Sequence, residues 1–208
     1  MSAHAETAQE DRANAGFTER WYALRMDTEA QSAGTDPRVE VDVAERSFTL
    51  TRWFDAPRER VWRAWTDPRE LAAWWGPHGY TNPVVDADFR PGGGLRIVMR
   101  SPEGVDFPMV GEIIAIEPPS RLVFTDDISD NAPAEWRARL DRNRPSQPAG
   151  SPLRMVVEVT FEERDGGTLL TVTDTFASDE DRDAIMRDGA VSGWSESMER
   201  LEALVTAA

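Results

Sequence analysis

Short segments of alternating apolar and polar residues dominate residues 81–176 and constrain the fold more than any other feature of the chain. A two-residue period places successive side chains on opposite faces of a β-strand, so each segment predicts a strand with one apolar face. Turn-forming residues separate the segments, as in 91–94 (PGGG) and 165–167 (DGG). We therefore predict a meander of antiparallel strands.

Helical patterns flank this meander on both sides. A β-rich segment, 47–54, precedes two short helices, the second of which begins with Asp67 as its N-cap, Pro68 at its first position and Glu70 in a capping box. After the meander, Ser178 caps one long final helix with an apolar stripe formed by Val191, Trp194, Met198, Leu201 and Val205. This order predicts an α+β fold, in which a curved antiparallel sheet wraps around the C-terminal helix.

Two stretches fall outside the regular pattern. Residues 1–46 form a polar extension, in which Phe17 and Trp21 suggest one short helix within 17–26. Residues 128–152 interrupt the meander with Pro, Asn, Arg and Ser. We expect the remainder, 47–206, to be one domain that contains the 128–152 insertion.

Charge and cysteine content limit the functions open to the chain. The net charge of −15 opposes binding to nucleic acid and to anionic membranes, and no segment approaches the ~20 apolar residues of a membrane span. There are no cysteines, which excludes disulfides and thiolate sites, and the N-terminus lacks the pattern of a signal peptide. We expect a cytoplasmic protein, and a homodimer is among the assemblies that the sequence allows.

Several motifs in order resemble the SRPBCC or START-like superfamily, also described as Bet v 1-like. They are the segments 53–62 (WFDAPRERVW), 65–68 (WTDP), 74–77 (WWGP), 117–123 (EPPSRLV) and 193–194 (GW). The closest branch is similar to the C-terminal domain of the activator of heat-shock protein (Hsp) ATPase. The resemblance implies a helix-grip fold with a hollow between the sheet and the long helix.

This fold hosts different functions, so the resemblance leaves several open. The first is binding of a small apolar or aromatic ligand, for transport, sequestration or resistance. The second is a protein-interaction module like the co-chaperone domain, and the third is an enzyme of the cyclase/dehydratase kind. The family often has His just before the end of its last strand, where this chain has Asp174.

The expected ligand cavity has a volume of ~300 Å³ or more and is lined by aromatic and Met side chains. Plain core packing is the more common role of any single Trp, but the implied hollow needs a wall. We expect that wall to contain Trp75, Phe89, Met99, Met155, Asp174, Phe176, Trp194 and Met198.

Asp174 has the same strand parity as Leu170 and Val172, which places it on the inner face. A carboxyl group on an apolar wall has a raised pKa and can act as an acid or base. The alternative, an Asp in water at the cavity mouth, is favoured because Asp is seldom buried unpaired.

No catalytic set and no cofactor or metal site is expected. His4 and His78 are the only histidines, and neither has a second ligand at metal spacing. The 128–152 insertion is interpreted either as a solvated loop or as a flap over the cavity with Trp136 as its anchor. Four arginines of this segment, Arg137, Arg139, Arg142 and Arg144, predict a basic patch that catches an anionic head group.

Overall fold

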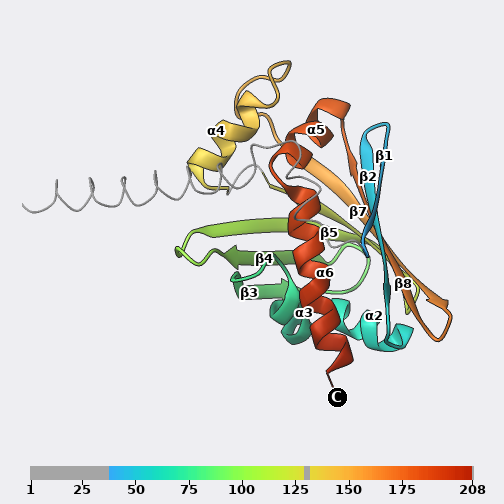
Figure 1. Cartoon of the computed structure of the whole chain (residues 1–208). Coiled ribbons are helices and arrows are strands. Elements are labelled where there is room, and N and C mark those ends of the chain that lie inside the picture. Colours follow the sequence, from blue (N-terminus) through green and yellow to red (C-terminus); the bar gives the residue numbers. More distant parts are fainter. Residues whose placement is uncertain (1–37, 129–131, 208) are drawn as a thin grey trace, which may run out of the picture. The chain divides into compact units, whose positions relative to one another are not determined.

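The computed structural model describes residues 38–128 and 132–207, which form one curved antiparallel sheet with helices on its inner face (Figure 1). Its strands are β1 (Glu40–Ala44), β2 (Ser47–Phe54), β3 (Thr81–Ala87), β4 (Gly94–Arg100), β5 (Asp106–Glu117), β6 (Arg121–Asp127), β7 (Arg154–Arg164) and β8 (Gly167–Phe176). Their order in the sheet is β1-β2-β8-β7-β6-β5-β4-β3. The expected meander and helix-grip fold are confirmed.

Five helices are described: α2 (Arg58–Thr66), α3 (Pro68–Trp74), α4 (Ala134–Arg142), α5 (Asp179–Arg187) and α6 (Ala190–Thr206). Figure 1 shows α6 lying across the sheet, with α2 and α3 toward one end and α4 and α5 toward the other. The Asp67 carboxylate caps α3 by accepting hydrogen bonds from the amides of Arg69 (2.8 Å) and Glu70 (3.3 Å). Glu70 forms ion pairs with Arg60 and Arg63, so the reciprocal half of the capping box is not made.

The expectation that one helix runs from Ser178 to the C-terminal end of the domain is wrong, because the chain forms two helices, α5 and α6, that meet at Asp188 and Gly189. Ser178 does cap α5, and its side chain accepts a hydrogen bond from the amide of Asp181. The chain then breaks at Gly189, whose φ of 93° lies in the left-handed region that glycine adopts without steric cost. The apolar stripe belongs to α6 alone. The break lets the chain change direction beside the cavity described below.

The sheet also begins earlier than the expected boundary at residue 47. Residues 40–44 form the edge strand β1 and pair with β2, from Glu40 opposite Thr51 to Ala44 opposite Ser47. All five residues of β1 are exposed, so the strand buries no apolar face of its own. Glu40, Val41, Asp42 and Val43 alternate as in a strand, and backbone pairing with β2 makes this segment part of the sheet. Residues 1–37, with the short helix expected within 17–26, lie outside the described residues.

Arg200 on α6 fixes the segment that follows α3. Its guanidinium donates hydrogen bonds to the carbonyl oxygens of Ala73 (2.9 Å), Trp75 (3.2 Å), Gly76 (2.7 Å) and Pro77 (2.9 Å). Burial lowers the pKa of Arg200 from its usual value. These bonds hold one end of the candidate site against α6.

Candidate functional site

A cavity of about 210 Å³ lies between the inner face of the sheet and α6. Its wall is mainly apolar and comes from both the sheet and the helices. The lining residues include Trp75, Met99, Phe107, Phe124, Asp126, Trp136, Met155, Val157, Asp174, Ile185, Asp188, Gly193, Trp194 and Ser197. The expected volume of ~300 Å³ or more is wrong, because aromatic side chains such as Trp75, Phe124 and Trp194 occupy part of the space between sheet and helix.

Three neighbouring strands form the floor of the cavity. Val157 on β7 lies opposite Phe124 on β6 and opposite Asp174 on β8, and Met155 on β7 lies opposite Asp126 on β6. Partners directly across a ladder project from the same face, and so do residues two apart on one strand. The strand register therefore brings two carboxyl groups to an otherwise apolar floor.

Two tryptophans face this floor. Trp75 follows α3, and Trp194 lies on the stripe of α6, with ring centroids 5.3 Å apart and planes at 77°. Trp65 of the core stacks on Trp194 at 6.1 Å, which fixes the orientation of that ring. The indole Nε1 of Trp194 donates a hydrogen bond to Oδ2 of Asp174 at 3.1 Å.

Asp174 is an acid buried in an apolar wall. Its side chain is buried, with 2% of the residue exposed, and its Oδ1 has no hydrogen-bond partner among the described residues. Burial raises the pKa of Asp174 to about 7, although the hydrogen bond from Trp194 acts in the opposite direction. The favoured interpretation of Asp174 as a solvated residue at the mouth is therefore wrong.

Asp126 is a second acid of the same kind. The residue as a whole is half-buried, but its Oδ1 has no contact with solvent and no partner among the described residues. Burial, together with the negative charges of Asp174 and Asp127, raises the pKa of Asp126 well above its usual range. The cavity therefore holds two carboxyl groups that are short of hydrogen-bond donors.

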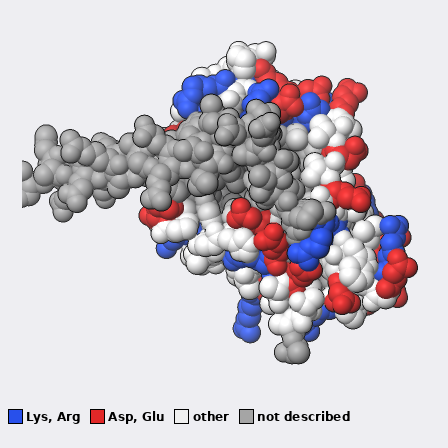
Figure 2. All heavy atoms as spheres, in the orientation of Figure 1, with Lys and Arg blue, Asp and Glu red and all other residues white. Residues whose placement is uncertain are grey.

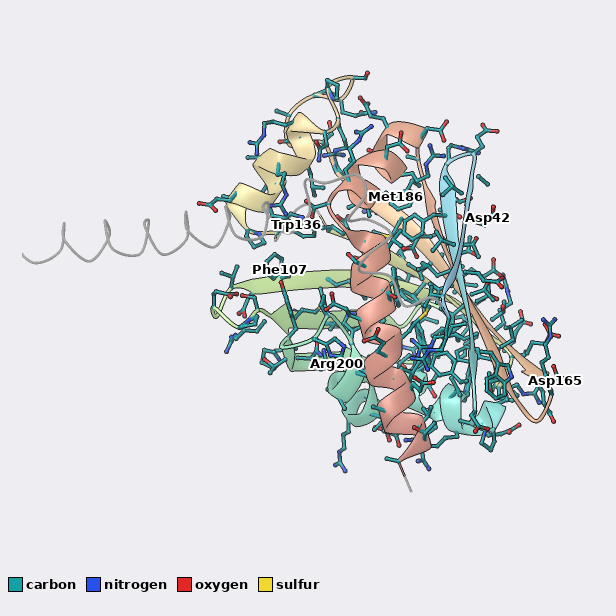
Figure 3. All side chains as sticks on the ribbon, in the orientation of Figure 1. Asp42, Phe107, Trp136, Asp165, Met186 and Arg200 are labelled. Carbon is teal, nitrogen blue, oxygen red and sulfur yellow. The ribbon has the colours of Figure 1, made fainter. Side chains whose placement is uncertain are left out.

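Helix α4 closes the end of the cavity near the break between α5 and α6. The indole of Trp136 and the guanidinium of Arg139 both donate to the carboxylate of Asp188, which directly precedes Gly189. The ring of Trp136 also packs edge-on against Phe107 of β5, with centroids 5.6 Å apart. Figure 3 shows Trp136 projecting from α4 toward the strand that carries Phe107.

The arginines of the insertion do not form the expected anion-binding patch. Arg139 is engaged with Asp188, and Arg144 is buried in contact with Asp181, Asp141 and the carbonyl oxygen of Ser151. None of the four arginines belongs to the described cavity wall. In Figure 2, basic side chains are visible at the α4 end, and acidic and basic side chains are mixed over the rest of this face.

The structure gathers most, but not all, of the expected cavity residues. Trp75, Met99, Met155, Asp174 and Trp194 lie in the wall, together with Trp136 of the expected flap. Phe176 packs instead on Phe48 of β2 at 5.8 Å, Met198 is fully buried in the core, and Phe89 packs against the core just after β3. Strand alternation had placed Phe89 and Phe176 toward the interior, and helical spacing had done so for Met198, but neither pattern distinguishes core from cavity.

Sequence reasoning missed Asp126, Asp188 and Phe107. Strand β6 continues to Asp127, and the alternation from Phe124 was the signal that places Asp126 inward. Asp188 was assigned to the interior of an uninterrupted helix. The dipeptide Asp188-Gly189 was the available signal, because Gly in the left-handed region often ends a helix.

Residues 38–128 and 132–207 contain no group of three or more His, Asp or Glu side chains that could hold a metal ion. None of the helices in these ranges has the length and apolar content needed to cross a bilayer.

Comparison with known proteins places this fold and cavity in a family. The model of the family "Activator of Hsp90 ATPase homolog 1-like protein" matches residues 55–206. The class is thus a START-like helix-grip protein. Within that class, the chain belongs to the family of Activator of Hsp90 ATPase homolog 1-like proteins. No functionally curated protein matches it.

Solved structures of bacterial proteins share the fold. Protein Ms6760 from Mycobacterium smegmatis is 32% identical over 82% of this chain and 96% of its own, with a TM-score of 0.65. A protein from Arthrobacter aurescens is 28% identical over 81% and 92%, with a TM-score of 0.66. Protein CV1439 from Chromobacterium violaceum is 27% identical over 78% and 99%, with a TM-score of 0.63.

Proposed function

We propose that this protein binds a small apolar or aromatic molecule in the cavity between the sheet and α6, for transport, sequestration or resistance. The observation that supports this most directly is the cavity of about 210 Å³, with Trp75 and Trp194 in its wall. A cavity of ~150 Å³ is large enough for benzene. We therefore expect a ligand of one or two rings, or an alkyl chain of similar bulk.

A pair of substitutions on β7 tests this proposal. Val157 is buried and lines the floor, whereas Val156 is 37% exposed on the opposite face. Val157→Phe fills the cavity, so we expect it to weaken binding of ethylbenzene, a neutral probe, at least tenfold in calorimetry. Val156→Phe adds the same ring outside the cavity and should bind like the parent. Absence of binding to the parent, or equal binding by both variants, would contradict the proposal.

The natural ligand requires a separate measurement. Native mass spectrometry of the purified parent should show a co-purifying small molecule that is missing from Val157→Phe. A cytoplasmic location and a homodimer stay predictions, to be checked by fractionation and by analytical ultracentrifugation.

The family match supports a second candidate, a protein-interaction module. The description of the matching family names an activator of Hsp90 ATPase, and the match covers residues 55–206. Under this alternative, the protein would raise the ATPase rate of an Hsp90 from a related organism. The rate should then be unaffected by Val157→Phe, because that substitution acts inside the cavity.

A further inference from the structure

The cavity combines aromatic walls with acidic groups and lacks basic ones. Among the described wall residues, the titratable side chains are Asp126 on β6, Asp174 on β8 and Asp188 between α5 and α6. Asp188 already accepts hydrogen bonds from Trp136 and Arg139 of α4. Within the described part of the chain, Asp126 and Asp174 each keep one buried oxygen without a donor. An unsatisfied buried acceptor costs free energy, which a ligand that supplies a donor would recover.

The aromatic side chains favour the same ligand chemistry. Trp75, Trp136 and Trp194 line the cavity together with Phe107 and Phe124. The faces of such rings attract cations, and Trp attracts them most strongly. A carboxylate ligand would instead meet two acids and no described basic group. The net charge of −15 also attracts cations and repels anions at long range.

We propose that the ligand is an apolar cation, a small aromatic or alkyl amine bound as its ammonium form, with its apolar part against Trp75 and Trp194 and its charge against Asp126 and Asp174. This inference rests on the proposed function, because it uses the same cavity. It specifies which chemical class of apolar molecule the cavity selects.

The state of the two acids makes binding dependent on pH. Burial raises the pKa of both groups, that of Asp174 to about 7, so near neutral pH Asp174 of the empty cavity partly holds a proton that an ammonium group would displace. Asp127 adds its negative charge to Asp126, and Asp188 remains paired with Arg139. Cation binding should therefore release protons and weaken as the pH falls below about 7, where Asp174 becomes protonated.

Two probes of nearly equal shape show how much of the binding depends on the positive charge of the ligand. Benzylamine and ethylbenzene have the same number of heavy atoms, and only benzylamine carries an ammonium group. At pH 8 we expect the parent to bind benzylamine at least tenfold more tightly than ethylbenzene by calorimetry. At pH 7, where Asp174 of the empty cavity is partly protonated, the observed enthalpy for benzylamine should change with the ionisation enthalpy of the buffer, because binding releases part of that proton.

Substitutions of Asp126 and Asp174 test whether these two acids cause the preference for benzylamine. Asp126→Asn combined with Asp174→Asn should weaken benzylamine binding at least tenfold and change ethylbenzene binding less than threefold. Asp165→Asn is the control, since Asp165 is exposed in the turn between β7 and β8 and lies outside the cavity wall. It should leave the affinity for both probes unchanged.

The outcomes distinguish this inference from the function on which it rests. Equal binding of both probes, or benzylamine binding that the double variant retains, would overturn the inference and leave apolar ligand binding intact. Tighter binding of acetophenone, a neutral hydrogen-bond acceptor, would also overturn it, because the acids would then act as protonated donors. Failure of every probe to bind the parent would refute the proposed function itself.

Discussion

Asp174 shows how the fold changes the chemistry of a single residue. An aspartate in water has a pKa near 3.8, and burial in this wall raises it to about 7. Only one of its oxygens accepts a hydrogen bond, from Trp194. The charged form is therefore costly in the folded protein, which is acceptable at a binding site and unfavourable for stability.

Stability should depend on pH through this residue. Because the pKa is higher in the folded than in the unfolded protein, the folded state keeps a proton between about pH 4 and pH 7 that the unfolded chain releases. The contribution of Asp174 to the free energy of unfolding therefore falls as the pH rises through this window, and stays constant above it. The full difference corresponds to about 4 kcal/mol.

We expect Asp174→Asn to stabilise the protein by about 2–4 kcal/mol at pH 8.5 and by much less at pH 4.5. Urea unfolding at both pH values measures this, with Asp165→Asn in the exposed turn between β7 and β8 as the control. A variant that differs from the parent by the same free energy at both pH values would show that Asp174 does not titrate in this range. The neighbouring acid, Asp126, acts in the same direction and remains in both proteins.

At the scale of elements, the contact between α4 and the α5–α6 junction determines how the cavity is closed. The carboxylate of Asp188 accepts hydrogen bonds from both Trp136 and Arg139 of α4. Arg144, further along the insertion, donates a hydrogen bond to Asp181 of α5. The segment is thus more firmly attached than a solvated loop. We propose that α4 is the flap, and that opening requires these bonds to Asp188 to break.

We expect Trp136→Phe combined with Arg139→Gln to accelerate release of a bound probe about tenfold or more, because the indole N–H is lost and a shorter, uncharged amide replaces the guanidinium that pairs with Asp188. The melting temperature should fall by only a few degrees, since the core of the sheet is untouched. Stopped-flow displacement of the probe gives the rate. Arg142→Gln, an exposed position on the same helix, is the control. A release rate equal to that of the parent would exclude α4 as the gate.

At the scale of the whole molecule, the domain extends from the start of the described chain to the end of α6. Arg38 forms an ion pair with Glu202 of α6 at 2.7 Å, and β1 covers the outer edge of β2. The first contact joins residues 164 positions apart in the sequence, whereas the second is a hairpin between two adjacent strands. The described domain therefore includes residues 38–46, which were expected to belong to the polar extension.

Two truncations test this boundary. We expect a chain of residues 38–208 to fold with one cooperative unfolding transition, because it keeps every described strand. A chain of residues 47–208 lacks β1 and should lose a further 1–3 kcal/mol, roughly the range of a moderately destabilising change. Thermal unfolding followed by circular dichroism compares the two. An unfolded 38–208 chain would show that residues 1–37 belong to the core.

Local patterns determined much of this fold without the structure. The alternation in β4, β7 and β8, the cap at Asp67 and the apolar stripe of α6 each depend on residues close together in the chain. Such patterns reflect the steric and hydrogen-bonding preferences of short segments, so they predict elements and their order. They also placed Trp75, Met99, Met155, Asp174 and Trp194 on faces that line the cavity.

The tertiary structure alone decided which inward-facing residues line the cavity and which pack in the core. Phe176 and Met198 lie on inward faces of their strand and helix but pack in the core, whereas Asp126 and Asp174 line one cavity only through the register of β6, β7 and β8. The break at Gly189 had a local signal, but the hydrogen bonds from Trp136 and Arg139 of α4 that hold Asp188 beside the cavity come from another part of the sequence. Burial and pairing between distant segments set the volume of the cavity and the pKa of its acids, and no local pattern encodes them.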